Sequence, residues 1–152
     1  MAIQLVISLL FTAVFLFFNN IVVGLDFNFL SLVDLPSALI VTVFPLVFML
    51  ILHGWKNTKS AFLSACNRKS NKKELVSAKL FFKNFGNTVF TAASVAFLIA
   101  FISIMKDLDD GSALAPNLAF ASVNLLYAGL INLIILLPFK IVINRKLSDI
   151  EE

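Results

Sequence analysis

The polar residues of this chain that could do chemistry are few, and most of them interrupt long apolar runs. Asn117, Ala121, Asn124, Ala128 and Asn132 recur at steps of four and three, which places them on one face of a helix. Small side chains let helices approach closely, and amide side chains hydrogen-bond across helices or line a polar path. An amide left unsatisfied in hydrocarbon costs several kcal/mol, so we expect this face to line a subunit interface or a pore.

Hydroxyl and amide groups form a second pattern in two other apolar runs. Thr91 and Ser94 lie three residues apart in one run, and Gln4, Ser8 and Thr12 recur at steps of four in another. Each set shares a helix face that could meet a pore or a neighbouring helix. The alternative is that these faces only pack helices together, because a hydroxyl can also bond the carbonyl four residues earlier on its own helix.

The chain holds none of the residue sets that enzymes or metal sites use. His53 is the single histidine, with no Cys, His or acid at metal-ligand spacing, and the single cysteine, Cys66, excludes an internal disulfide. A Ser–His–Asp set, a Cys–His pair and a glycine-rich phosphate loop are also absent. We therefore expect no enzyme activity, no metal and no cofactor. We interpret His53 as a polar residue at a membrane boundary and Cys66 as a small hydrophobic residue.

A cluster of three acids lies in the short stretch from Lys106 to Pro116, between two of the most apolar runs. Asp107, Asp109 and Asp110 lie there with one glycine and one proline. A solvated turn explains them without special chemistry, because Lys106 can pair with a nearby acid, the Asp–Gly step favours a turn and Pro116 can begin a helix. We predict that this stretch is an exposed loop and not a catalytic site.

The elements that must position these residues are membrane-spanning helices. Of the 152 residues, 60% are hydrophobic and 14% are charged, which leaves too few polar residues to cover a water-soluble domain. Crossing a bilayer takes about 20 apolar residues in a helix. The sequence predicts a single all-α membrane domain over residues 1–152, with four spans at residues 2–25, 35–52, 88–105 and 118–139. The first is a span and not a signal peptide, because it lacks a basic start and is too long.

The positions of lysine and arginine predict how the spans are oriented. Residues 53–87 carry eight of the twelve basic side chains against one acid, Glu74, and residues 140–152 add three more. The two other connections are acidic. We therefore expect the loop 53–87, the tail 140–152 and both termini on the cytoplasmic side.

The loop 53–87 is predicted to be a short cytoplasmic helical hairpin, made of two amphipathic helices that lie close to the lipid headgroups. A nucleic-acid interface would need aromatic side chains interleaved with basic ones on a folded surface. We therefore attribute the net charge of +3 to the basic residues expected on the cytoplasmic side of the membrane. No nucleic-acid partner is expected. Pro45 interrupts the second span, where we expect a kink.

Several short strings in the second, third and fourth spans and their borders resemble one known membrane family. They are "VDLPSALIV" at 33–41, "LDD" at 108–110, "SAL" at 112–114, Pro116, "LLY" at 125–127 and "LP" at 137–138. Together with four spans and both ends inside, they are similar to the MotA/TolQ/ExbB superfamily, in a short form that lacks the large cytoplasmic domain of the flagellar stator MotA. The resemblance extends over most of the chain.

The resemblance implies a function as well as a fold. Members of this family form homo-oligomers, usually pentamers, around a single-span MotB- or ExbD-like partner whose intramembrane aspartate carries the ion. The chain would then be a subunit of an ion-motive-force-driven motor, a proton channel of the bacterial inner membrane that energises transport or an envelope process. The partner's acid would explain why no Asp, Glu, Lys, Arg or His lies in the middle of a predicted span.

The same resemblance assigns candidate site residues. Those implied to face the pore or the neighbouring subunit are Thr91, Ser94, Phe97, Asn117, Asn124 and Asn132. The three acids Asp107, Asp109 and Asp110 would lie at the outer mouth of the ring, where repeated acids concentrate cations. Pro116 and Pro138 would set the ends of the moving helices.

Departures from the family pattern leave two alternatives open. Phe97 stands where the family often has a hydroxyl residue, and Asn124 and Leu125 replace a pair of threonines. The cytoplasmic part is reduced to Trp55–Phe85. A bulky Phe97 could narrow an ion path, so one alternative is a non-conducting oligomeric membrane scaffold of the same architecture. The other is a stand-alone small ion channel with rings of asparagine as its filter.

Overall fold

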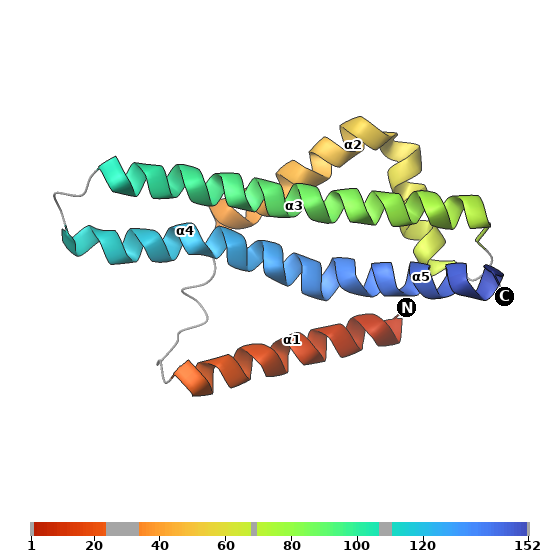
Figure 1. Cartoon of the computed structure of the whole chain (residues 1–152), viewed down its shortest axis with the longest axis horizontal. Coiled ribbons are helices and arrows are strands. Elements are labelled where there is room, and N and C mark those ends of the chain that lie inside the picture. Colours follow the sequence, from red (N-terminus) through yellow and green to blue (C-terminus); the bar gives the residue numbers. More distant parts are fainter. Residues whose placement is uncertain (1, 24–33, 68–69, 107–110, 152) are drawn as a thin grey trace.

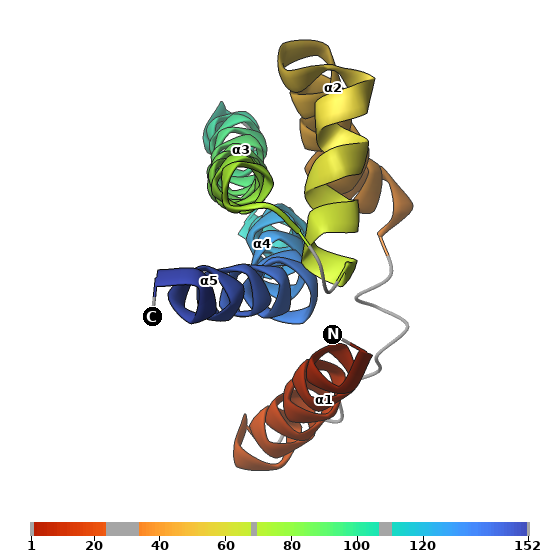
Figure 2. The ribbon, with the colours of Figure 1, turned by 90° about the vertical axis from the view of Figure 1, so that its right-hand side faces the viewer.

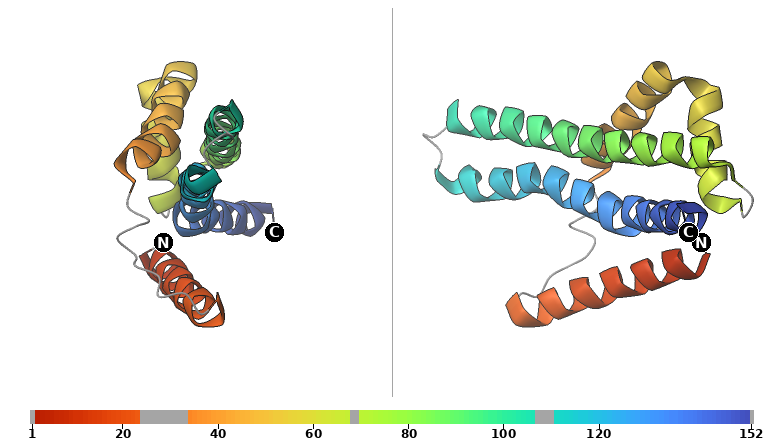
Figure 3. Two further views of the ribbon diagram at one scale, coloured as in Figure 1. Left: turned by 90° about the vertical axis from the view of Figure 1, so that its left-hand side faces the viewer. Right: turned by 45° about the vertical axis from the view of Figure 1, so that its right-hand side comes forward.

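The computed structural model of the chain describes residues 2–23, 34–67, 70–106 and 111–151, and the predicted all-α class is confirmed there (Figure 1). The helices are α1 (Ala2–Val23), α2 (Leu35–Cys66), α3 (Lys72–Lys106), α4 (Gly111–Ile131), the π-helix η2 (Asn132–Leu136) and α5 (Leu137–Glu151). Helix α3 lies antiparallel beside the continuous path of α4, η2 and α5 (Figure 3). Helix α1 stands apart from α2 and α3 and meets the rest of the chain near η2 (Figure 2).

Three helical stretches are long and apolar enough to cross a membrane, namely Leu35–Cys66, Lys72–Lys106 and Leu114–Ile150. Many of their large apolar side chains are exposed in the single chain, among them Phe44, Ile99 and Phe120, as expected of helices whose solvent is lipid. The predicted first span is also helical, over the 22 residues of α1, a length of about 33 Å. Its apolar stretch among the described residues, Ile3–Phe18, is shorter than the usual span.

Asp34 determines where α2 begins. Its carboxylate accepts a hydrogen bond from the backbone N–H of Ser37 at 3.3 Å and another from the Ser37 hydroxyl, which satisfies one of the free donors at a helix start. Pro36 lies in the first turn, where its missing N–H costs nothing. The predicted start of the second span at Leu35 is therefore also the observed start of the helix.

The break in α2 lies at Gly54, beyond the predicted end of the second span. Gly54 has φ 75° and ψ 153°, a backbone conformation that side chains with a Cβ rarely adopt. Figure 1 shows α2 changing direction at this level, so that its last part turns back toward α5. Pro45, where a kink was expected, is buried within the helix.

Residues 55–66 and 72–87 are both helical, as predicted, but they are not two separate short helices. The second of them continues without a break into the predicted third span, so that α3 is a single helix of 35 residues. The junction near Thr88 contains Gly86 but no proline, and one glycine costs a helix only about 1 kcal/mol. Because each added residue adds one backbone hydrogen bond, the helix propagates through the polarity change.

The two prolines expected at helix ends lie inside helical segments, which corrects that prediction. Helix α4 begins at Gly111 and contains Pro116, and Pro138 lies one residue into α5, which runs on to Glu151. The ring of Pro138 displaces the carbonyl four residues earlier and provides no N–H. The π-helix accommodates this, because the backbone N–H of Leu137 bonds the carbonyl of Asn132, five residues back. The tail after Phe139 is accordingly a helix.

The densest packing joins the last part of α2, the first part of α3 and α5, which we call the aromatic bundle. Phe82 is fully buried there, stacks on Phe139 with 4.7 Å between ring centroids and meets Phe62 edge-on at 5.1 Å. Phe81 packs edge-on against Phe82 at 5.4 Å. Aromatic pairs at these separations add to the burial free energy, so this bundle anchors the helices that continue into the predicted spans.

Lys146 of α5 closes the end of α2 within the aromatic bundle. Its Nζ donates to the backbone carbonyls of Ser64, Ala65 and Asn67 at 3.0, 2.8 and 2.6 Å. These are carbonyls at the C-terminus of α2, where a cation also complements the helix dipole. Burial lowers the pKa of the Lys146 amine from its usual value, and the electrostatic interaction with Cys66 opposes that effect.

Candidate functional site

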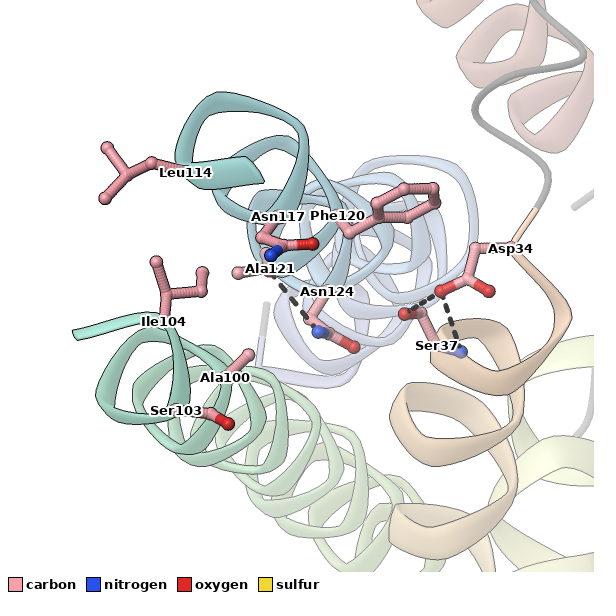
Figure 4. A pocket seen from close by; sticks show the side chains of 10 residues that line it. All are labelled: Asp34, Ser37, Ala100, Ser103, Ile104, Leu114, Asn117, Phe120, Ala121 and Asn124. Carbon is pink, nitrogen blue, oxygen red and sulfur yellow. Dashed lines mark hydrogen bonds between the residues drawn. The ribbon is translucent and has the colours of Figure 1, made fainter. Parts of the chain in front are cut away.

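A polar cavity lies between the start of α2, the end of α3 and the first half of α4, and we call it the Asp34 cavity. Its volume is about 590 Å³, and it is lined by Asp34, Ser37, Ala100, Ser103, Ile104, Leu114, Asn117, Phe120, Ala121 and Asn124 (Figure 4). Half of these residues carry a side-chain oxygen. The cavity therefore brings one carboxylate, two hydroxyls and two amides together among apolar side chains.

The Asp34 carboxylate is held at the wall of this cavity by the start of α2. Its bonds from Ser37 fix its orientation, and it lies at the N-terminal, positive end of the α2 dipole. The backbone N–H of Asp34 also donates to the Tyr127 hydroxyl at 3.0 Å, which ties this helix start to α4. The acid is thus placed by two helices and not by a loose loop.

Asn124 lies deepest among the amides of the cavity. The residue is 7% exposed, and its Nδ2 donates to the carbonyl of Ala121 at 3.3 Å. Its Oδ1 is buried and has no hydrogen-bond partner among the described residues. Figure 4 shows this oxygen on the side of α4 that faces Ser37. A buried acceptor without a partner lowers the free energy of unfolding by about 1–3 kcal/mol. A water, an ion or a group from another chain that bound this oxygen would remove that cost.

A longer groove runs along α3 and joins the Asp34 cavity at Asn124. We call it the α2–α3 groove; its volume is about 860 Å³, and it shares Ser37, Ala100, Ser103 and Asn124 with the Asp34 cavity. Its remaining walls are mostly apolar, with Asn87, Thr88 and Thr91 as polar residues at the far end. The two hollows therefore adjoin beside α3, with polar residues in the Asp34 cavity and at the far end of the groove.

The predicted site residues divide into groups instead of sharing one surface. Asn117 and Asn124 line the Asp34 cavity, and Thr91 lines the α2–α3 groove. Asn132 lies elsewhere, in a third cavity beside Lys140. Asn117 and Asn124 therefore share one cavity, as expected of residues on one helix face. Asn132, farther along the helix, has different neighbours.

Two of the predicted site residues line none of these three cavities. The Ser94 hydroxyl bonds the carbonyl of Phe90 on its own helix at 2.9 Å, which is the packing alternative considered for such hydroxyls. The Phe97 ring stacks on Phe101 with 6.0 Å between centroids. Neither residue meets Asn117 or Asn124 within the cavities of the single chain.

The remaining predicted site residues are the three acids of the loop and the two prolines. Asp107, Asp109 and Asp110 lie outside the described residues, so their role at an outer mouth stays a prediction. Pro116 is exposed within α4, and Pro138 is buried at the start of α5.

Sequence reasoning missed Asp34 and Ser37 as site residues and treated Asp34 only as a charge in an acidic turn. A signal was available, because Asp followed three residues later by Ser, with Pro between them, is typical of a helix start. What the sequence does not reveal is that this helix start packs against Tyr127 and faces Asn124.

The oxygen set of the Asp34 cavity suits water or a small monovalent cation. Carboxylate, hydroxyl and amide oxygens are hard ligands, and a single carboxylate matches a single positive charge. Within residues 2–23, 34–67, 70–106 and 111–151, no cluster of three or more His, Cys, Asp or Glu could hold a metal ion. No protein-family model matches the chain, and no curated protein or solved structure with which it was compared matches it either.

Proposed function

We propose that this chain is a MotA/TolQ/ExbB-like subunit of an ion-motive-force-driven inner-membrane motor. In this proposal it assembles, as a pentamer, around a single-span partner that carries an intramembrane aspartate. Both termini and the aromatic bundle lie on the cytoplasmic side, and ion flow energises transport or an envelope process. The observation that carries the proposal is the buried, unpartnered Oδ1 of Asn124 at the junction of the Asp34 cavity and the α2–α3 groove.

The Asp34 cavity supports the first part of an ion path. The Asp34 carboxylate raises the local concentration of cations, and the oxygens of Ser37, Asn117 and Asn124 can replace part of a hydration shell. Asn124 then passes the ion toward the α2–α3 groove. Because Oδ1 of Asn124 already lies buried without a donor, contact with a cation satisfies it at no further cost in lost protein hydrogen bonds.

The ionisable group that an ion-driven motor needs must come from another chain. Between Asp34 and His53, between Lys83 and Lys106, and between Asp110 and Lys140, the sequence has no Asp, Glu, Lys, Arg or His. Motors and proton-coupled carriers bury at least one such group in the membrane. A single-span partner with one intramembrane aspartate supplies it.

The test combines assembly with flux. The chain is expressed together with candidate single-span membrane proteins, and the molecular mass of the detergent-extracted complex is measured. Proton and sodium flux are then measured after reconstitution in liposomes. We expect a pentamer with a bound partner, and a flux that falls at least about tenfold in Asn124→Leu, since about 1.4 kcal/mol of lost ion stabilisation gives that factor.

The matched control is Ser122→Ala, also on α4, where the exposed hydroxyl only bonds the carbonyl of Leu118. We expect this variant to conduct like wild type. A monomer that recruits no partner, or an Asn124→Leu complex that assembles and conducts at the wild-type rate, contradicts the proposal.

A non-conducting scaffold of the same architecture is the second candidate, and the stacked pair of Phe97 and Phe101 favours it. Two aromatic rings on the face of α3 that meets the oligomer axis would block an axial path. In that case the wild-type complex is silent in the flux assay, and Phe97→Thr begins to conduct. Flux from the chain alone, without a partner, would instead indicate the stand-alone channel.

A further inference from the structure

The third cavity lies between α3 and the path of α4, η2 and α5, where the predicted spans lead into the aromatic bundle. We call it the Lys140 cavity; its volume is about 470 Å³, and it is lined by Gly86, Asn87, Phe90, Thr91, Ala128, Gly129, Asn132 and Lys140. It has one cationic side chain, and none of its lining residues is an acid. It shares Asn87 and Thr91 with the α2–α3 groove, but Asn132 and Lys140 line the Lys140 cavity and not that groove.

Gly86 lets the Lys140 amine lie directly against α3. A Cβ added at Gly86 would come within 3.0 Å of the Lys140 Nζ and 3.4 Å of a Leu136 methyl. Within the described part of the chain, no hydrogen bond or ion pair joins this amine to another residue. The cation is therefore half-buried at the cavity wall with its donors available.

The π-helix brings a second donor to the same cavity. In a regular α-helix, Asn132 and Lys140 would point about 80° apart, because eight residues overshoot two turns. The wider turn over Asn132–Leu136 takes up the extra residue, and both side chains line the cavity. Asn87 and Thr91 face them from α3, so the cavity presents one ammonium, two amides and a hydroxyl, all able to donate.

The cavity lies at the depth of a lipid headgroup. Asn87 is 19 residues before Lys106 on the unbroken helix α3, a distance of about 28 Å, close to the roughly 30 Å of a bilayer's hydrocarbon core. If Lys106 marks one boundary, the cavity marks the other. Its Phe90 and Asn132 are exposed, so acyl chains can lie against the aromatic ring while a headgroup enters.

We propose that the Lys140 cavity binds the phosphodiester of an anionic phospholipid in the leaflet on the side of the aromatic bundle. The Lys140 ammonium pairs with the phosphate charge, and the side chains of Asn87 and Asn132 donate to its oxygens. The chemistry is that of a phosphate anion, and the lipid is the source that the depth of the cavity favours. The site does not depend on ion conduction or on the partner.

The test measures thermal unfolding of the full chain, purified in an uncharged detergent, while lipid is titrated. We expect phosphatidylglycerol to raise the unfolding temperature saturably, and phosphatidylcholine, whose phosphate is neutralised by its own ammonium, to leave it unchanged. Glycerol phosphate tests for a soluble source. Equal protection by phosphatidylcholine overturns the proposal, and equal protection by glycerol phosphate overturns its assignment to a lipid.

Two pairs of variants locate the effect. Lys140→Gln should weaken phosphatidylglycerol binding about fivefold, whereas Lys83→Gln, which removes one exposed charge from α3 outside the cavity, should not. Gly86→Ala should weaken binding because its methyl displaces the amine, whereas Ser122→Ala, which shortens an exposed side chain of α4 outside the cavity, should bind like wild type.

Unfolding without added lipid shows whether each variant is folded. Asn132→Leu replaces Lys140→Gln as the decisive variant if the latter does not fold, because it removes a donor without changing charge. Wild-type lipid affinity in the folded Gly86→Ala protein together with either of these variants overturns the proposal.

Discussion

At Asn124 the side chain that the proposed function needs is one that lowers the stability of the isolated chain. Its side chain is buried, one of its amide protons makes only a 3.3 Å bond, and its oxygen has no partner among the described residues. A protein that used this position only for packing would gain by placing leucine there, because removing an unsatisfied buried acceptor recovers its desolvation penalty. In the proposed function, Oδ1 of Asn124 is the atom that contacts the ion in the Asp34 cavity.

Asn124→Leu is therefore predicted to raise the free energy of unfolding of the isolated chain by about 1 kcal/mol. The measurement is thermal unfolding in detergent, without lipid or partner. Asn117→Leu serves as the control, because Asn117 is exposed on the same helix and its replacement should change stability little. A loss of stability in Asn124→Leu would mean that Oδ1 is satisfied in the protein.

Among the elements, α2 shows how one backbone conformation positions two parts of the molecule. Before Gly54 the helix carries Ser37 to the Asp34 cavity, and after Gly54 it packs Phe62 against Phe82 in the aromatic bundle. A straight helix could not serve both contacts. Gly54 permits the change of direction because it has no Cβ at φ 75°.

Gly54→Ala is predicted to lower the free energy of unfolding by about 1–2 kcal/mol, which is the cost of a left-handed conformation for a residue with a Cβ. Gly129→Ala provides the opposite control, since Gly129 is inside the regular helix α4 and its Cβ would meet open space. There, alanine should stabilise the protein by about 0.5–1 kcal/mol. Thermal unfolding of both variants side by side measures the contrast, and equal stabilisation would show that Gly54 is not strained.

At the scale of the whole molecule, the buried core is centred on the aromatic bundle and extends from there into the predicted spans at Met49, Val89 and Leu136. The spans expose apolar side chains on several faces, whereas Leu75, Phe82 and Ile143 of the aromatic bundle are almost completely buried. The bundle therefore holds α2, α3 and α5 together, while the spans remain free to pack with lipid or with other chains. In the proposed oligomer, these exposed faces of the spans would contact the neighbouring subunits.

Phe82→Ala is predicted to cost about 3–5 kcal/mol, the usual penalty for removing a fully buried aromatic ring. The matched control is Phe18→Ala on α1, where the ring is 65% exposed and the cost should stay below about 0.5 kcal/mol. Thermal unfolding in detergent distinguishes them. Similar losses in the two variants would mean that the bundle does not carry the stability of the molecule.

By itself the sequence determined the helical class, the start of α2 at Leu35 and the presence of three long apolar helices, because hydrophobicity and the position of a proline are local signals along the chain. It also identified the asparagine face of α4, since a 3.6-residue period is visible without knowledge of any neighbour. It placed a boundary near Thr88 and helix ends at Pro116 and Pro138 because composition and prolines are local signals. Helix propagation and the π-turn overrode them.

Only the tertiary structure decided which of these residues meet. Asn124 lines one cavity with Asp34 and Ser37, whereas Asn132, eight residues farther along the chain, lines another cavity with Lys140. The physical reason is that different elements pack against a helix at different points along its axis. Each residue therefore contacts the element that packs at its own position on that axis. The start of α2 passes at Asn124, and the turn of η2 carries Lys140 round to Asn132.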